Sequence, residues 1–160
     1  MSTIEIPSTR SSEPPKVSDA FVLELRIKAA RVPALPVRPL TGLEVAVAVR
    51  YALDEGGQDL PLDLSGMKRI LIDPRARTAR VQPGVTPDEL VEAAAQWGLA
   101  PLVDRSGFVQ ANLLAAQVVT PDGDLVETDA ELLSALRTGR AKGIVVDATY
   151  RLHIAAELRR

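Results

Sequence analysis

Residues 63–100 constrain the fold more than any other part of the chain, because they contain a hairpin, a glycine turn and a capped helix without interruption. Two short aliphatic stretches, 69–73 and 78–81, are joined by an Asp-Pro turn that begins at Asp73. A helix start signal follows soon after the second stretch. This density of turn and cap residues predicts two paired strands followed by a helix.

Three segments share one helix start signal, a threonine with a glutamate three residues later. In this capping box the threonine hydroxyl accepts from the backbone N–H of the glutamate, and the glutamate carboxylate accepts from the N–H of the threonine. The pairs are Thr41 with Glu44, Thr86 with Glu89, and Thr128 with Glu131. We therefore predict three short helices.

Each predicted helix carries an apolar face and ends at glycine. The faces are Val45, Val49, Ala52 and Leu53, then Leu90, Val91, Ala94 and Trp97, then Leu132, Leu133 and Leu136. The helix stops are Gly56 and Gly57, Gly98, and Gly139. Because Trp97 falls on an apolar face, we expect it in the core.

Residues 21–29, FVLELRIKA, alternate between apolar and charged or polar side chains. A period of two favours a half-buried strand, which could lie at an edge and be offered to a partner. A helix is the alternative, since these residues are good helix formers and Ser18 could cap it.

Further strands are expected over 113–120, 125–127 and 144–153, and the first two are joined by a turn. The turn residues are Pro121, Asp122 and Gly123. Strands and hairpins together with the capped helices predict an α+β fold.

Composition narrows the classes of function. Of 160 residues 46% are apolar, 3% are aromatic and none is cysteine, so the core is aliphatic, and no disulfide or thiolate metal site can form. A net charge of −2 with scattered arginines argues against nucleic acid as a partner. No metal is assigned.

Residues 1–17 are rich in Ser, Thr and Pro and predict a disordered arm before a single domain over 18–160. No apolar run reaches the length of a signal-peptide core or of a membrane span. We therefore expect no membrane association and a cytoplasmic protein.

Several motifs occur in the order found in one enzyme family. They are PVRPLTGLEVAVAVRYALDEGG, DLSGMKRILIDPRARTARVQPG with a following helix that ends in GLA, NLLAAQVVTPDGDLVETDAELLSALR, and GIVVDATYRLHI. These segments resemble the FAD-binding domain, of the PCMH type, of berberine-bridge-type FAD-linked oxidoreductases. The resemblance covers most of residues 36–154 and implies a truncated two-subdomain FAD-binding domain with hairpins and three short capped helices.

The chain departs from the family where the family holds its cofactor. The family's R-GGGHS loop cradles the FAD diphosphate with backbone amides and often carries a covalently linked histidine, but residues 55–64 read EGGQDLPLDL here. The second glycine-rich segment is reduced to PLVDRSGFVQA, and Ala111 stands where the family has aspartate. With no cysteine either, the resemblance implies that any FAD is bound noncovalently. The family's separate substrate domain has no counterpart in this sequence.

The resemblance places residual cofactor contacts at six residues. These are Pro83, Gly84, Gly139, Arg140, Gly143 and Ile144. The first two match a turn that frames the cofactor in the family. The loop 138–143 could hold a phosphate through its basic side chains and free amides, and its alternative interpretation is a solvated loop.

Other chemistry-bearing residues have simpler interpretations. We expect a structural or surface role for His153, which is the only histidine. A solvated strand face is expected for Arg75, Arg77 and Arg80, and a turn role rather than calcium binding for Asp122 and Asp124.

Two hypotheses follow from the resemblance and its gaps. The first is a reduced homologue of an FAD-binding oxidoreductase domain that has lost efficient redox chemistry and acts as a binding or partner module, with a protein partner or a second copy of the chain. The second is a small FAD-dependent oxidoreductase that binds FAD noncovalently, with the missing loops supplied by a subunit or partner. No catalytic residue is assigned, and the ligand is unidentified.

Overall fold

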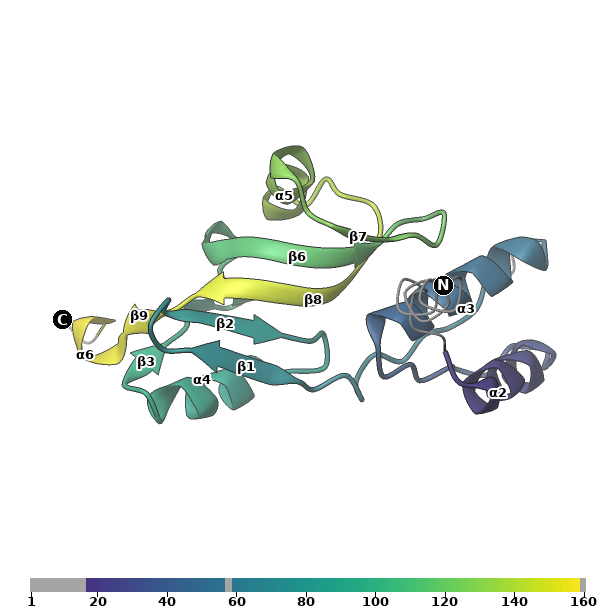
Figure 1. The fold of residues 1–160 in the computed structure, drawn as a ribbon, viewed down its shortest axis with the longest axis horizontal. Helices are drawn as coiled ribbons and strands as arrows, with labels where there is room; N and C mark the ends of the chain where they lie inside the picture. Colours follow the sequence, from purple (N-terminus) through teal and green to yellow (C-terminus); the bar gives the residue numbers. More distant parts are fainter. Residues whose placement is uncertain (1–16, 57–58, 159–160) are drawn as a thin grey trace, which may run out of the picture.

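The computed structural model describes residues 17–56 and 59–158, and its centre is a five-stranded antiparallel sheet in the order β1-β2-β8-β6-β7 (Figure 1). The strands are β1 (Ile70–Asp73), β2 (Thr78–Val81), β6 (Leu113–Val119), β7 (Leu125–Glu127) and β8 (Ile144–Arg151). Two small antiparallel pairs accompany the sheet. They are β3 (Leu99–Ala100) with β9 (His153–Ile154), and β4 (Val103–Asp104) with β5 (Gly107–Phe108).

Helices pack against two regions of this sheet. Helices α4 (Pro87–Ala95) and α5 (Ala130–Arg137) send apolar side chains into one core with β2, β6 and β8. At the other end of the sheet, α3 (Gly42–Asp54) packs on β6, β7 and β8, and α2 (Asp19–Ala29) packs on α3 (Figure 1). A 3-10 turn η2 (Gln110–Asn112) and helix α6 (Ala155–Leu158) complete the elements. The predicted α+β class is confirmed.

A bulge in β8 lets this strand contribute to two cores. Opposite the neighbouring β6 residues 117–118, β8 contains one extra residue, Val146. Val145 therefore packs with Ala148 in the core under α4 and α5, while Val146 packs against α3. The approach to α3 is close, because a Cβ at Gly42 would lie 2.8 Å from Cγ2 of Val146.

Residues 21–29 lie in a helix, so the predicted strand is wrong and its alternative is confirmed. Ser18 caps α2, and its Oγ accepts from the N–H of Phe21 at 3.2 Å. Phe21 and Leu25, one turn apart, are buried, whereas Leu23 is 60% exposed. Helix propensity and the cap outweigh the alternation, and no edge strand exists here for a partner.

The first two predicted helix starts are confirmed. Thr86 and Glu89 form a complete capping box at the start of α4. At α3 the Thr41 hydroxyl accepts from the N–H of Glu44, but the Glu44 carboxylate accepts from the N–H of Leu40 instead of Thr41.

The third predicted start is wrong by one residue. Asp129 caps α5, and its carboxylate accepts from the N–H of Leu132 at 2.8 Å. Aspartate is as good a cap as threonine, and the Thr128 hydroxyl is engaged elsewhere, because it accepts from the N–H of Ala116 in β6.

Trp97 is 57% exposed, so its expected core position is wrong. Helix α4 ends at Ala95, and the chain turns at Gly98 with φ of 69°. The apolar helical face therefore stops before it reaches Trp97. Of the predicted stops for α3, Gly56 adopts a φ of 90° and Gly57 lies outside the described residues.

The remaining expectations concern the surface. Of the predicted arm at 1–17, only Val17 is described, and it packs against the core between α2 and α3. The arginines at 75, 77 and 80 are exposed, as predicted, although the first two lie in the β1–β2 turn instead of a strand. Within the part of the chain that the structure describes, no helix is long and apolar enough to span a membrane.

Substitution of two leucines in α2 tests the helix against the strand. A strand would place Leu23 and Leu25 on one face, so alanine at either position would have similar effects. The helix buries only Leu25, and Leu25→Ala should therefore lower the free energy of unfolding by about 2–5 kcal/mol, while Leu23→Ala should change it by less than about 0.5 kcal/mol. Urea unfolding measures both, and equal losses would contradict the helix.

Glu89 should make stability depend on pH. Hydrogen bonds from Thr86 and from Lys68 hold the pKa of Glu89 below its ordinary value of 4.5. The stabilisation is therefore complete above that value and is lost as pH falls through the lowered pKa. We expect the stability difference between wild type and Glu89→Gln to be constant above about pH 5 and to shrink as pH falls to about 3. Glu92→Gln, on the same helix, is the control, and a pH-independent difference would contradict the prediction.

Candidate functional site

The Pro83–Gly84 turn is fixed by its own backbone contacts. A Cβ at Gly84 would lie 2.6 Å from the carbonyl oxygen of Ser65 and 2.8 Å from that of Met67. The N–H of Gly84 also donates to the Met67 carbonyl at 2.8 Å. Its amide is thus used within the fold, and the glycine is required by close packing.

In the loop after α5, several backbone N–H groups donate to carbonyls at the end of the helix. The N–H groups of Arg140 and Ala141 both donate to the carbonyl of Ala135, at 2.8 and 3.2 Å, and the N–H of Gly139 donates to that of Leu136. The Arg140 side chain donates to the hydroxyl of Thr138. These contacts form a C-terminal cap of α5 and leave no ring of free amides for a phosphate.

Gly143 and Ile144 start β8 against β6. A Cβ at Gly143, where φ is 128°, would lie 2.7 Å from the carbonyl oxygen of Val119. Ile144 pairs with Val119 and lines a hollow beside α3, whereas Pro83 lines a different hollow on the sheet. The structure therefore does not gather the six predicted residues into one site.

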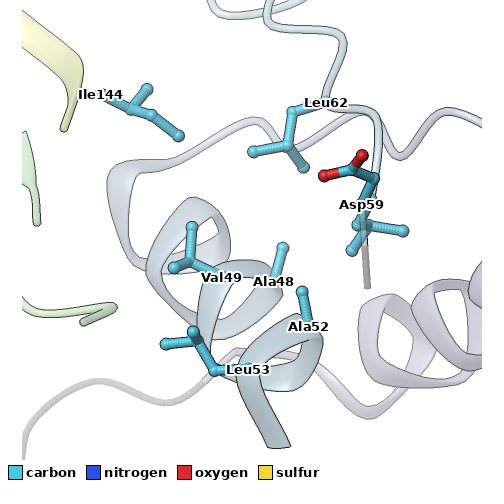
Figure 2. A pocket seen from close by; sticks show the side chains of 8 residues that line it. Ala48, Val49, Ala52, Leu53, Asp59, Leu62 and Ile144 are labelled. Atoms are coloured by element: carbon cyan, nitrogen blue, oxygen red, sulfur yellow. The ribbon is translucent and has the colours of Figure 1, made fainter. Parts of the chain in front are cut away.

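The segment that follows α3, where the resemblance places the family's diphosphate loop, borders a hollow of about 210 Å³. Figure 2 shows Ala48 and Ala52 on the helix, with Leu62 and Asp59 across from them and Ile144 at the far end. The complete lining is Ala48, Val49, Ala52, Leu53, Asp59, Leu60, Leu62 and Ile144. We call it the α3 pocket.

The α3 pocket has a negative electrostatic potential. Asp59 is the only charged residue among those that line it. The pocket faces the C-terminal half of α3, where the last turn has no basic residue and the helix dipole is negative. Arg50 on the same helix donates to the carbonyl of Gly123 at 2.9 Å and pairs with Asp124, so its charge is engaged with the β6–β7 turn.

A second hollow, also about 210 Å³, lies over the sheet near the Pro83 turn. Phe108 and Tyr150 line it, with ring centroids 4.9 Å apart and tilted by 36°. Burial raises the pKa of Tyr150, and its hydroxyl lies 3.4 Å from the amide of Gln110. This hollow is an aromatic-walled extension of the core.

The uncovered face of the sheet carries an ion pair. Arg80 Nε donates to Asp147 Oδ2 at 2.8 Å, and this hydrogen bond raises the pKa of Arg80. Glu127, Thr128 and Thr149 line the same shallow hollow of about 170 Å³. The paired charges give it mixed polarity.

His153 lies in β9 opposite Ala100, and its Nε2 is 3.4 Å from Nδ2 of Asn112. No hydrogen bond joins it to a carboxylate among the described residues, as a general base would need. Over the same part of the chain, no group of three His, Cys, Asp or Glu residues could hold a metal ion.

Comparison with known proteins agrees with this fold. The chain is 28% identical to (R)-6-hydroxynicotine oxidase of Paenarthrobacter nicotinovorans over 76% of this chain and 36% of that enzyme. The crystal structure of 6-hydroxy-D-nicotine oxidase of Arthrobacter nicotinovorans has a TM-score of 0.68 at 27% identity, over 76% of this chain and 36% of that one. Berberine bridge enzyme has a TM-score of 0.66 at 16% identity, over 88% and 40%. No family model matches.

The chain resembles the FAD-binding domain of berberine-bridge-type FAD-linked oxidoreductases and shares its fold. It spans about a third of the length of the curated oxidase. That alignment runs over 165 residues, whereas 76% of 160 residues is about 122, so roughly 40 positions are gaps in this chain. The likeness makes FAD the cofactor to test.

The described residues do not fit the FAD diphosphate. The α3 pocket offers apolar side chains and a carboxylate, and the amides of Gly84, Gly139, Arg140 and Ala141 are already bonded within the fold. The volume of the α3 pocket is also below the roughly 300–1,000 Å³ that is typical of pockets for drug-sized ligands. The sequence indicates that the glycine-rich loop of the family is absent from residues 55–64. It does not indicate a role for Asp59, because only the fold places Asp59 beside α3.

A glycine substitution tests whether Gly84 serves the fold. Gly84→Ala would push a methyl group into backbone carbonyls and should cost about 1–3 kcal/mol of stability. Gly66→Ala is the matched control, since a Cβ there would meet only side-chain atoms, a methyl group of Leu40 at 3.1 Å and Nη2 of Arg38 at 3.9 Å, and should cost less than about 1 kcal/mol. Thermal unfolding measures both, and an unchanged Tm in Gly84→Ala would contradict the structural role.

Proposed function

We propose that this chain is a reduced homologue of an FAD-binding oxidoreductase domain that acts as a binding or partner module without efficient flavin redox chemistry. The observation that supports this most is the α3 pocket. At the place of the diphosphate loop it presents aliphatic walls and the Asp59 carboxylate. A carboxylate repels a diphosphate, and aliphatic side chains donate no hydrogen bonds to it.

The local interactions that determine the fold are present, although the described residues offer no cradle for the cofactor. The complete capping box of α4, the close approach of Gly42 to β8 and the Asp129 cap of α5 all remain. A domain that keeps these features without the cradle fits a role in binding. The exposed Leu23 and Ile27 on α2 provide apolar surface that a protein partner or a second copy would cover.

A second candidate function is a small FAD-dependent oxidoreductase that binds FAD noncovalently, with the missing loops supplied by a subunit or partner. The 28% identity to an oxidase favours it. It requires the partner's loops to provide the amides that the described residues do not offer. We further propose a cytoplasmic location for either function.

Flavin content separates the two candidates. We expect the purified protein to be colourless and its Tm to be unchanged by added FAD. If the protein had an FAD site, an FAD concentration of about 100 times the Kd would stabilise the fold by about 2.7 kcal/mol. For a chain of this size, that would raise the Tm by several degrees. A yellow protein that releases flavin on denaturation would overturn the proposal.

A further inference from the structure

We propose that the α3 pocket binds a small hydrophobic ammonium, with its apolar part against α3 and its charged group at Asp59. The inference rests on the proposed function, since the same pocket lies where a cofactor cradle would be. It goes further by naming the chemical class of the ligand and the residues that select it.

The apolar part of the ligand is set by Ala52, whose short side chain on α3 leaves a hollow that Leu62 and Ile144 bound on the other sides (Figure 2). Ala48, one turn earlier on the helix, is fully buried and forms part of the wall. A volume of about 210 Å³ suits a single ring or a short branched chain, not a dinucleotide. Hydrophobic burial would supply most of the affinity.

The charge of the ligand is set by Asp59 and by the helix end. In Figure 2 the Asp59 carboxylate points from its backbone toward Leu62, over the hollow. Asp54 and Glu55 at the end of α3 add negative charge, and the carbonyls of its last turn add the negative end of the dipole. No lysine or arginine is among the residues that line the pocket.

The selectivity follows from these two features together. A neutral ligand would gain the apolar contact alone, and an anion would meet the repulsion of Asp59. A cation gains both contacts. Because Asp59 is exposed, the charge contributes modestly and is screened by salt.

Three probes that differ in charge test the proposal on the full chain. Benzylammonium, benzyl alcohol and benzoate have similar size, and chemical-shift titration measures their affinity. We expect benzylammonium to bind in the millimolar range, roughly threefold to fivefold tighter than benzyl alcohol, with benzoate weakest. The preference should fall as salt rises. Equal affinity for all three would overturn the proposal.

Two variants assign the contacts. Asp59→Asn should remove the preference for benzylammonium over benzyl alcohol and keep the affinity for the alcohol, while Asp122→Asn, in the β6–β7 turn, is the charge control. Ala52→Leu should weaken all three probes by filling the hollow, while Ala20→Leu, exposed on α2, is the size control. Wild-type affinities in both Asp59→Asn and Ala52→Leu would overturn the site.

FAD titration of the same samples separates this proposal from the proposed function. Binding of benzylammonium without FAD supports both. If neither binds, the ammonium proposal fails and the proposed function stands. If FAD binds and displaces benzylammonium, the pocket belongs to the cofactor and both fail. If FAD binds without displacing it, only the proposed function fails.

Discussion

Two of the cores of this protein, the one under α4 and α5 and the one against α3, depend on β8 and on its bulge. The strand pairs with β2 on one side and with β6 on the other, so it cannot move without breaking two ladders. The extra residue Val146 rotates the start of the strand, so that Val145 joins the core under α4 and α5 while Val146 packs against α3. Ile144, at the end of this bent segment, borders the α3 pocket. The bulge that divides β8 between the two cores thereby also helps to place one wall of the α3 pocket.

Backbone amides show that several turns of this chain hydrogen-bond within the fold itself. Amides that could cradle an anion are instead consumed locally: that of Gly84 by the carbonyl of Met67, and those of Arg140 and Ala141 by Ala135. Each of these hydrogen bonds stabilises a turn or a helix end. In this chain the turns therefore serve the fold first, and a ligand would have to compete with contacts that are already made.

Patterns local in sequence predicted much of this structure. Strands β2 and β7 and the start of α4 follow from turn and cap residues a few positions apart. The failures involve competition between signals or contacts distant in sequence. At 21–29 alternation competed with helix propensity, and Thr128 lost its cap role to a hydrogen bond with Ala116. Trp97 is exposed because α4 ends before it. Asp59 borders the α3 pocket only because the chain folds back beside α3. No motif or spacing in the sequence around Asp59 predicts this position.

Under the proposal made above, the α3 pocket prefers a cation at the position where the resemblance places a loop that binds an anion. A diphosphate loop supplies positive amide dipoles that offset the negative C-terminal end of the helix before it. In this chain the segment after α3 carries Asp59, and Asp54 and Glu55 lie at the end of the helix, so negative charge lies beside the aliphatic walls of the pocket. All three carboxylates are exposed, so solvent and salt screen their field. The apolar contacts would therefore supply most of the affinity of a ligand here, and the charge would set its preference for a cation.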